Sequence, residues 1–301
     1  MKRKGLKGIS LVLCIAAMSA SIAGCGAQAG DTVTIGSKNF TENMILGSMF
    51  AQLIEAKTDL KVEHKENLGG TMVCFEAIKK GQLDIYPEYT GTALITQLKK
   101  DVINDADKVY EIVKDEFHKQ FKIKWLSPLG LNNTYAVAVS EEFAEEKNIS
   151  KVSELAPYAK DLIFGAEHEF FDRDDGFDGM IKAYGLEFKG KPAKMDVAMK
   201  YQAIAQGKID VTDAFATDGQ LITYKLKVLE DDKNFFPPYY GAPIIREDTL
   251  EKHPELEDIL NLLGGKISDA EMQEMNYKVE AENKSTKDVA REFLESKGLL
   301  K

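Results

Sequence analysis

The chain has 301 residues, of which 44% are hydrophobic and 29% charged, with only 8 prolines. These proportions exclude a disordered or fibrous chain and are typical of a soluble globular protein long enough for two compact domains. The formal net charge is −10, with no Arg/Lys-rich stripe beyond the first residues, which argues against a nucleic-acid-binding protein.

The first 24 residues have the pattern of an export signal. Four basic side chains precede an apolar stretch over residues 9–22 that is too short to span a bilayer comfortably. The stretch ends in Ile22-Ala23-Gly24-Cys25, which resembles the lipobox of bacterial lipoproteins, in which the cysteine is lipidated. We predict a signal peptide over 1–24, a lipid on Cys25 and a tether over 25–30; a plain anchor helix is the alternative. Two acyl chains would hold the protein stably on the outer face of the bacterial cell membrane.

Removal of the signal leaves an acidic protein with one internal cysteine. Four of the 39 Lys and Arg leave with it, so 35 remain against 49 Asp and Glu, a charge of −14. Cys14 also leaves and Cys25 is the predicted lipid site, so Cys74 has no disulfide partner and is expected to be buried and inert. The four histidines lack the spacing of a metal pair, so we predict no metal and no cofactor.

From residue 31 onward, short β-rich runs alternate with amphipathic stretches. We expect strands at 32–35, 61–65 and 83–86. Between them we expect a helix that starts with a capping box from Asn39 to Glu42, and a second helix over 71–80 with Thr71 as N-cap and Gly81 after its end. This βαβαβ pattern predicts a mainly parallel sheet covered by helices.

An internal repeat indicates that this unit occurs twice. Residues 77–85, AIKKGQLDI, recur 126 positions later as AIAQGKIDV at 203–211. Upstream of each copy lies a matching strand that ends in glycine, at 33–36 and at 162–165. Agreement in both sequence and order predicts two related α/β lobes.

The segments after the repeated strands are the natural place for a ligand, because ligands bind beyond the carboxyl ends of strands in open parallel sheets. We interpret residues 86–92 and 212–219 as loops, in which Tyr89 corresponds to Phe215 and Thr92 to Asp218. Two equivalent aromatic residues suggest a cleft with facing aromatic walls. The alternative is that both rings are ordinary core residues.

Other aromatic and cationic residues fit such a cleft. The stretch 235–240 holds Tyr239 and Tyr240 in a segment stiffened by two prolines, and Tyr135 lies where a loop enters a strand, at a crossover between lobes. Converging tyrosines can enclose a quaternary ammonium by cation–π attraction. Lys38 and Arg173 lie in glycine-bearing loops and suit a carboxylate. The alternatives are a solvated Lys38 and an Arg173 paired at the surface with a neighbouring aspartate.

Five ordered motifs carry a resemblance to a known family. They are GSKNFTE at 36–42, NLGGT at 67–71, DIYPEYTGT at 84–92, TDG at 217–219 and FFPPY at 235–239. Together they resemble the substrate-binding proteins of osmoprotectant ABC importers, the glycine betaine/carnitine/choline family. The resemblance runs from about residue 33 to the C-terminus.

The resemblance implies a two-lobed, periplasmic-binding-protein-like α/β fold of type II that closes over a trimethylammonium compound and delivers it to a permease with its ATPase. Carried over by motif, the cage residues are Tyr89, Tyr135, Phe215 and either Tyr239 or Tyr240, and the carboxylate residues are Lys38, Thr92 and Arg173. It also implies lobe I over 31–132 plus 236–301 and lobe II over 133–235, and a monomer.

Two positions bear on which ligand is taken. Family members often carry Tyr where this chain has Phe215, and the loss of a hydroxyl allows a shift toward another betaine-like molecule, such as one that contains sulfur. Choline-restricted members resemble this pattern with Asp at the position of Thr92, so Thr92 favours carboxylated betaines.

Two other functional classes stay open. An exported enzyme would use Glu88, Asp174 and Asp175 as paired carboxylates, but the sequence supplies no nucleophile with a base, no metal set and no phosphate loop. A sensor or adhesin that binds ligand without transport is not separable from an importer subunit by this sequence.

Overall fold

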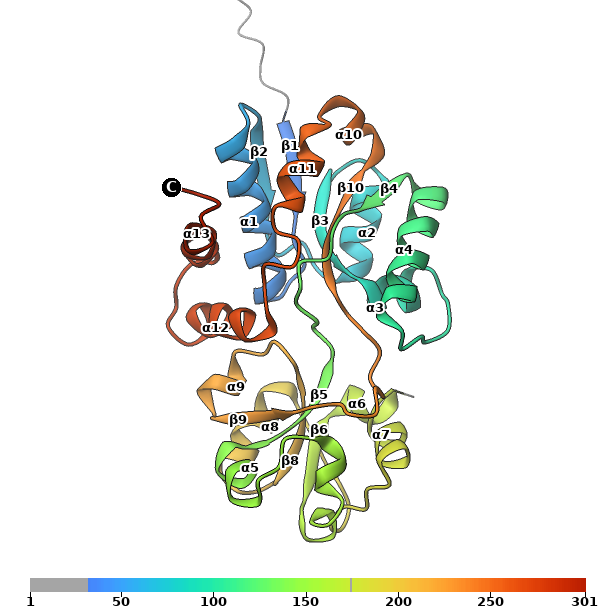
Figure 1. Cartoon of the computed structure of the whole chain (residues 1–301), viewed down its shortest axis with the longest axis vertical. Helices are drawn as coiled ribbons and strands as arrows, with labels where there is room; N and C mark the ends of the chain where they lie inside the picture. Colours follow the sequence, from blue (N-terminus) through green and yellow to red (C-terminus); the bar gives the residue numbers. More distant parts are fainter. Residues whose placement is uncertain (1–31, 174) are drawn as a thin grey trace, which may run out of the picture. The chain divides into compact units, whose positions relative to one another are not determined.

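The computed structural model describes residues 32–173 and 175–301. The predicted signal peptide, the lipid site Cys25 and the tether lie outside the described residues. Residues 32–301 belong to one unit, which contains two separate five-stranded sheets (Figure 1). Among the described helices, none is long and apolar enough to cross a bilayer.

The first sheet has the strand order β2-β1-β3-β10-β4. Its strands are β1 (Thr32–Gly36), β2 (Lys61–Lys65), β3 (Ile85–Tyr89), β4 (Ile123–Trp125) and β10 (Gly241–Arg246). Strand β1 pairs in parallel with β2 and β3, whereas β10 is antiparallel to both β3 and β4. Four strands therefore run in one direction and β10 in the other. We call this sheet and its helices lobe I.

The second sheet repeats this order as β7-β6-β8-β5-β9. Its strands are β5 (Tyr135–Ser140), β6 (Phe164–Glu167), β7 (Ala193–Met195), β8 (Val211–Phe215) and β9 (Leu226–Leu229). Strand β6 is parallel to β7 and β8, and β5 is antiparallel to β8 and β9. We call this sheet and its helices lobe II. The prediction of two related, mainly parallel lobes is confirmed.

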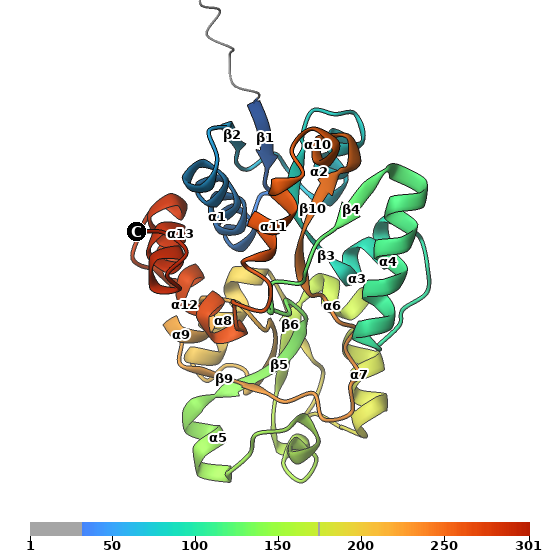
Figure 2. The ribbon, with the colours of Figure 1, turned by 45° about the horizontal axis from the view of Figure 1, so that its top comes forward.

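The helices cover both sheets (Figure 2). Lobe I carries α1, α2, α3, a π-helical turn η1, α4 and the C-terminal helices α10 to α13, and lobe II carries α5 to α9 with two short 3₁₀ turns. Their bounds are α1 Thr41–Lys57, α2 Thr71–Lys79, α3 Thr90–Thr92, η1 Ala93–Gln97, α4 Ala106–Phe121, α5 Glu141–Lys147, η2 Val152–Leu155, η3 Ala159–Asp161, α6 His168–Asp172, α7 Phe177–Tyr184, α8 Val197–Ala205, α9 Gln220–Thr223, α10 Glu247–Lys252, α11 Glu255–Asn261, α12 Asp269–Glu280 and α13 Thr286–Ser296.

The repeat is visible in individual hydrogen bonds. Asp84 accepts a bond from the Thr34 backbone N–H at 2.7 Å, and Asp210, its counterpart 126 positions later, accepts one from the Ile163 N–H at 2.8 Å. In both lobes the carboxylate thereby fixes the start of the central strand against its parallel neighbour. Helices α2 and α8 also end alike, because Gly81 and Gly207 have positive φ values of 69° and 65°.

Helix α1 is buried over most of its length because it is enclosed by β2, α11, α12 and α13. Its side chains Ile45, Met49 and Phe50 belong to the main core of lobe I. Cys74 in α2 is buried and free, as predicted, and burial raises the pKa of its thiol to about 11.

Two predictions of helix starts are wrong. Helix α1 starts at Thr41 after Phe40, with no side-chain cap, so there is no Asn39–Glu42 capping box. The Glu42 side chain is instead buried at the site described below. Thr71 is the first residue of α2, and Gly70 is the N-cap.

The repeated strands also start and end later than predicted. Residues 86–89 and 212–215 are parts of β3 and β8, not loops. Pro87 suggests a strand end, since proline cannot donate a ladder hydrogen bond. In the structure, β3 continues through Pro87, which lies directly opposite Pro243 in the antiparallel ladder with β10. Tyr89 and Phe215 are therefore the last residues of equivalent strands.

The chain passes between the lobes twice, between β4 and β5 and between β9 and β10, and an isolated antiparallel bridge joins Asn132 to Tyr240. The lobe boundaries near 132 and 235 remain a prediction. Helix α12 contacts the turn after β8, where Gln273 and Asn276 donate to the carbonyls of Ala216 and Thr217 at 2.6 and 2.8 Å. These contacts bring a lobe I helix against the end of a lobe II strand.

Candidate functional site

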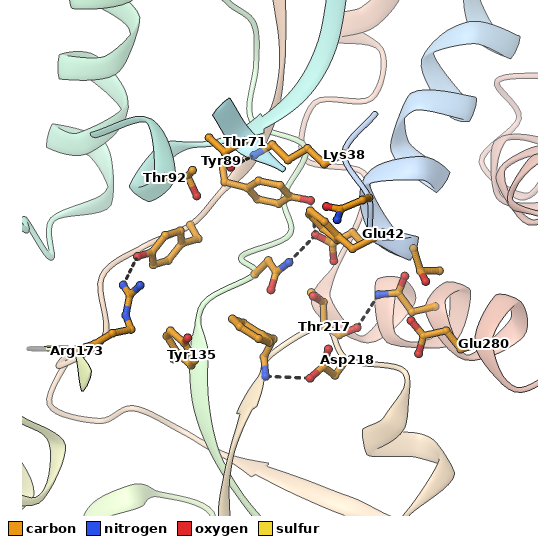
Figure 3. Close-up of a pocket in the computed structure, with 17 residues that line it drawn as sticks. Lys38, Glu42, Thr71, Tyr89, Thr92, Tyr135, Arg173, Thr217, Asp218 and Glu280 are labelled. Atoms are coloured by element: carbon orange, nitrogen blue, oxygen red, sulfur yellow. Dashed lines mark hydrogen bonds between the residues drawn. The ribbon is translucent and has the colours of Figure 1, made fainter. Parts of the chain in front are cut away.

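A cavity of about 610 Å³ lies at the carboxyl ends of β3 and β8 (Figure 3). Both lobes contribute to its wall. The lining residues are Lys38, Asn39, Phe40, Thr41, Glu42, Thr71, Tyr89, Thr92, Asn133, Tyr135, Arg173, Phe215, Thr217, Asp218, Tyr239, Asn276 and Glu280. Seven of the predicted site residues are among them: Lys38, Tyr89, Thr92, Tyr135, Arg173, Phe215 and Tyr239.

Aromatic rings form one part of the wall. Tyr135 begins β5 and lies directly opposite Phe215 in the antiparallel ladder, which brings their ring centroids to 4.6 Å. Tyr89 comes from the other lobe, at the end of β3. Tyr89 and Tyr135 are 4% and 5% exposed and belong to the hydrophobic cores of their lobes. Phe215 also packs against the lobe II core. The two interpretations of Tyr89 and Phe215 are thus compatible, since each ring packs in a core and also lines the cavity.

Of the two tyrosines after the paired prolines, Tyr239 lines the cavity and Tyr240 does not. The Tyr240 backbone N–H donates to the Thr90 hydroxyl at 3.1 Å, and its carbonyl accepts from the Thr90 N–H. Tyr240 thus ties the start of β10 to the start of α3. A further aromatic residue, Phe40, faces the cavity with its ring centroid 5.9 Å from that of Tyr89.

Arg173 lies on the aromatic side of the cavity. Its guanidinium makes two bonds of 2.7 Å to Asp175, donates to the Tyr239 hydroxyl at 3.2 Å, and lies 5.3 Å from the centre of the Tyr135 ring. The hydrogen bonds to Asp175 raise the pKa of Arg173, so the guanidinium stays charged. The planar side chain is therefore held beside two predicted cage tyrosines.

Lys38 is almost fully buried, with its ammonium already paired. It forms an ion pair with Glu88 and donates to the Thr71 hydroxyl at 3.1 Å. Glu88 also accepts from Tyr86 at 2.8 Å and from Gln97 at 2.7 Å. A solvated Lys38 is therefore excluded. Thr92, in α3, adds a hydroxyl to the same lobe I wall.

Glu42 is a buried carboxylate that faces the cavity. Its Oε1 accepts from the Tyr89 hydroxyl at 2.7 Å and from the Asn133 amide at 2.9 Å. Burial raises the pKa of Glu42 to about 7, although these hydrogen bonds favour the charged form. The Glu42 carboxyl therefore loses its proton and becomes negatively charged near neutral pH.

A buried ion network supports the lobe II side. Lys200 is fully buried and lies 2.7 Å from Asp213 and 3.5 Å from Glu167, and Glu167 accepts from the Tyr135 hydroxyl at 3.0 Å. The network orients Tyr135 from behind, and none of its three charged members lines the cavity.

Several cavity residues were not predicted as site residues. Phe40, Glu42, Thr71, Thr217 and Asp218 all lie inside the family motifs, so the sequence held a signal for them. Asn133 is the first residue of the predicted lobe II, at the predicted crossover. Asn276 and Glu280 lie four residues apart on one face of α12, and nothing in the sequence places that helix against β8.

The carboxylates considered for an enzyme are occupied elsewhere. Glu88 binds Lys38 and does not line the cavity, and Asp175 binds Arg173. Asp174 lies outside the described residues. Within residues 32–173 and 175–301, no three His, Cys, Asp or Glu side chains are grouped to hold a metal ion.

Comparisons with family models, relatives and solved structures agree on one family. The family model described as the substrate-binding domain of the ABC-type glycine betaine transport system matches residues 31–296. The chain is 37% identical, over 98% of its length and 97% of the relative, to a carnitine transport binding protein of Listeria monocytogenes. It is 36% identical to a glycine-betaine-binding protein of Pseudomonas aeruginosa, over 96% of this chain and 94% of the relative.

A third relative is named for a different ligand. The chain is 40% identical, over 89% of its length, to an ergothioneine transport permease/ergothioneine binding protein of Helicobacter pylori, of which it covers 48%. Among solved structures, a glycine betaine/carnitine/choline ABC transporter protein superimposes with a TM-score of 0.85 at 36% identity, covering 89% of this chain and 99% of that one. These matches confirm the predicted two-lobed fold.

Proposed function

The chain belongs to the family of substrate-binding domains of ABC-type glycine betaine transport systems, and from this premise we propose that its cavity captures a quaternary ammonium compound that bears a carboxylate. Carnitine, glycine betaine and ergothioneine, the compounds named for its relatives, share a trimethylammonium and a carboxylate. The observation that carries the proposal is that aromatic rings from both lobes and the Arg173 guanidinium meet in one cavity.

The trimethylammonium is proposed to lie against Tyr89, Tyr135, Phe215 and Tyr239, with Phe40 at the edge. A quaternary ammonium has no N–H that needs an acceptor, so ring faces alone can bind it, at about 0.5–2 kcal/mol per contact. Tyr240 is dropped from the cage because its side chain is not part of the cavity wall.

The carboxylate is proposed to bind Arg173 and the Thr92 hydroxyl. Lys38 lines the cavity but contributes its positive charge without a direct bond to the carboxylate, since its ammonium is already held by Glu88 and Thr71. This assignment changes the predicted role of Lys38 from a direct contact to a positioning charge 5.1 Å from the Tyr89 ring centre.

The protein is proposed to act as the monomeric, lipid-anchored, extracytoplasmic subunit of an ABC importer, joined to the membrane through Cys25. Ligand that bridges the two lobes would favour their closed arrangement by its greater affinity for it. The closed protein would then deliver the ligand to a permease driven by its ATPase. Binding without turnover is expected, as for a transport protein rather than an enzyme.

Isothermal titration of the purified protein with glycine betaine, carnitine and choline tests this function. Saturable binding of the two carboxylated compounds, stronger than that of choline, is expected. Arg173→Met should remove the advantage over choline, whereas Tyr89→Ala or Tyr135→Ala should weaken all ligands by about 1–2 kcal/mol. No heat with any compound, or unchanged affinity in both tyrosine variants, would contradict the proposal.

A further inference from the structure

Helix α12 presents two neighbouring faces to the two lobes. Met272 and Met275 are buried in the main core of lobe I, and Val279 packs against the same core. Gln273 and Asn276, each one position further along the helix, instead bond to the turn after β8 in lobe II. Because successive side chains are about 100° apart around a helix, these two sets form adjacent stripes. Helix α12 therefore connects the lobes without being part of either chain crossover.

The backbones of α12 and the turn after β8 approach each other closely at Gly219. A Cβ on Gly219 would lie 2.6 Å from the backbone nitrogen of Tyr277 and 2.8 Å from the carbonyl carbon of Asn276. The Gly219 φ and ψ values are −63° and −23°, which any residue can adopt. A side chain is therefore excluded at this position by the closeness of α12 and not by the conformation of the turn.

The turn that α12 holds carries part of the cavity wall. Phe215 comes directly before the turn and lines the cavity. Thr217 and Asp218, within the turn, line it on the same side as Glu280 of α12 (Figure 3). The Asp218 carboxylate accepts from the Phe215 backbone N–H at 3.2 Å and also from the Tyr201 hydroxyl. A shift of the turn relative to α12 would therefore move Phe215 and Asp218 together relative to lobe I.

The peptide groups of Ala216 link α12 to both crossovers. The Ala216 carbonyl accepts from the Gln273 side chain at 2.6 Å, and the Ala216 N–H donates to the Thr134 carbonyl at 2.9 Å. The Thr134 hydroxyl in turn donates to the Pro237 carbonyl at 2.8 Å. Thr134 lies between β4 and β5, and Pro237 lies between β9 and β10. One series of hydrogen bonds thus runs from α12 to the two segments about which the lobes would rotate.

We propose that Gln273 is a positioning residue that holds the two lobes in the arrangement in which both line the cavity. This inference rests on the proposed function, since it concerns how tightly a ligand that bridges the lobes is bound. Gln273 is not among the described residues that line the cavity, so it acts through Ala216 and not on the ligand.

A residue of this kind has an effect on binding that differs from that of a contact residue. When only a fraction of the protein has the binding arrangement, the measured affinity is reduced by that fraction for every ligand. Loss of the bond between Gln273 and Ala216 therefore lowers the affinities of different ligands by the same factor. Loss of a side chain that contacts one part of the ligand changes the ratio of these affinities instead.

Titration of the full protein with glycine betaine and choline tests this role. Gln273→Leu removes the donor at similar volume and should weaken both ligands by the same factor, about two- to tenfold, the size expected for one hydrogen bond. Gly219→Ala places a Cβ against α12 and should weaken both ligands more, again without a change in their ratio. Small-angle X-ray scattering without ligand should give a larger radius of gyration for Gly219→Ala than for the wild type.

The matched control is Glu274→Gln, on the same helix but 61% exposed, which should leave both affinities unchanged. Unchanged affinities in both Gln273→Leu and Gly219→Ala, or a changed ratio of the two ligands in Gln273→Leu, would overturn the positioning role and leave the proposed function standing. If the wild type binds neither ligand, the proposed function fails, and scattering alone then decides on the positioning role. In that case an unchanged radius of gyration in Gly219→Ala would overturn it.

Discussion

The two lobes share a frame and differ where they face each other. Each sheet has the same strand order, and each central strand is fixed by an equivalent aspartate, Asp84 or Asp210. At the strand ends, lobe I presents Tyr89 hydrogen-bonded to Glu42, while lobe II presents Phe215, which has no hydroxyl. The repeat has thus kept what builds a sheet and changed what meets a ligand.

The buried lysines of the two lobes also differ in whether they reach the cavity. In lobe I, Lys38 pairs with Glu88 and its side chain also lines the cavity. In lobe II, Lys200 pairs with Asp213 and Glu167 behind the cavity wall. One pair is part of the proposed site and the other only supports it, so variants at the two lysines separate binding from stability.

The largest expected effect is that of Lys200→Met. It leaves two buried carboxylates, Asp213 and Glu167, without a counter-charge, and breaking such a pair costs about 3–5 kcal/mol. Urea unfolding followed by circular dichroism measures the loss. Lys297→Met is the control, because its pair with Glu271 is at the surface, with side chains 27% and 38% exposed, and should cost at most about 1 kcal/mol. Equal losses would show that the lobe II network is not a stabilising element.

Glu42 makes the stability of lobe I depend on pH. Its pKa is about 7 in the folded protein against 4.5 ordinarily, because of burial. Between these values the folded state keeps a proton that the unfolded state releases, so this group destabilises the fold as pH rises from 4.5 to 7. The full difference is about 3 kcal/mol. The effect is absent below 4.5 and complete above 7.

Unfolding of the wild type and Glu42→Gln across pH 4–8 isolates this contribution. The variant should gain stability relative to the wild type as pH rises through that window, and the difference should then level off. A constant difference across the range would show that Glu42 titrates normally. Because both proteins share every other titrating group, their contributions cancel in the comparison.

Two glycines, one at the equivalent strand of each lobe, test whether the two sheets are packed equally tightly. A Cβ at Gly36 would lie 2.4 Å from Leu83, and one at Gly165 would lie 2.8 Å from Ile209, the counterpart of Leu83 in the repeat. Gly36→Ala and Gly165→Ala should each cost about 1–3 kcal/mol, with Gly36→Ala the more costly. In Gly241→Ala, another strand position, the nearest atom would be at 3.4 Å, an ordinary contact, so thermal unfolding should show little change. A loss at only one of the first two positions would show that one lobe relaxes more easily.

Most strands and helices could be predicted from the sequence, because they follow from the pattern of residues close together in the chain. Strand β2 follows from alternation and the C-terminal end of α2 from Gly81, and the repeat indicated the second lobe. The end of β3 was missed because Pro87 suggests a strand end, whereas β3 continues through it by pairing with β10, a strand far away in the chain. Asn276 and Glu280 were missed for the same kind of reason, since only tertiary packing brings α12 to the end of β8.

Some site residues were predicted from equivalent strand ends, as for Tyr89 and Phe215, and others from the family resemblance, as for Thr92 and Arg173. Tyr89, Phe215, Thr92 and Arg173 all line the cavity, whereas the choice between Tyr239 and Tyr240 needed the bridge between Asn132 and Tyr240. Glu42 was assigned to a helix cap because its spacing from Asn39 fits one. The buried environment that overrides this assignment comes from Tyr89 and Asn133, which are distant in sequence.

The smallest expected effect is at Phe215, whose counterpart in lobe I is a tyrosine, Tyr89. If Phe215 binds the ammonium through its ring face, Phe215→Tyr keeps the face and should change glycine betaine affinity by less than about twofold, while Phe215→Leu keeps an apolar side chain without the face and should lose about 0.5–2 kcal/mol. Titration of both variants separates cation–π attraction from simple apolar contact. Equal affinity in Phe215→Leu and the wild type would mean that lobe II contributes shape alone, and that the attraction for the cation comes from Tyr89 across the cavity and from Tyr135 beside Phe215. Tighter binding of glycine betaine by Phe215→Tyr would instead show that the absence of the hydroxyl weakens binding of this ligand. It would then follow that the end of β8 is adapted to a different ligand.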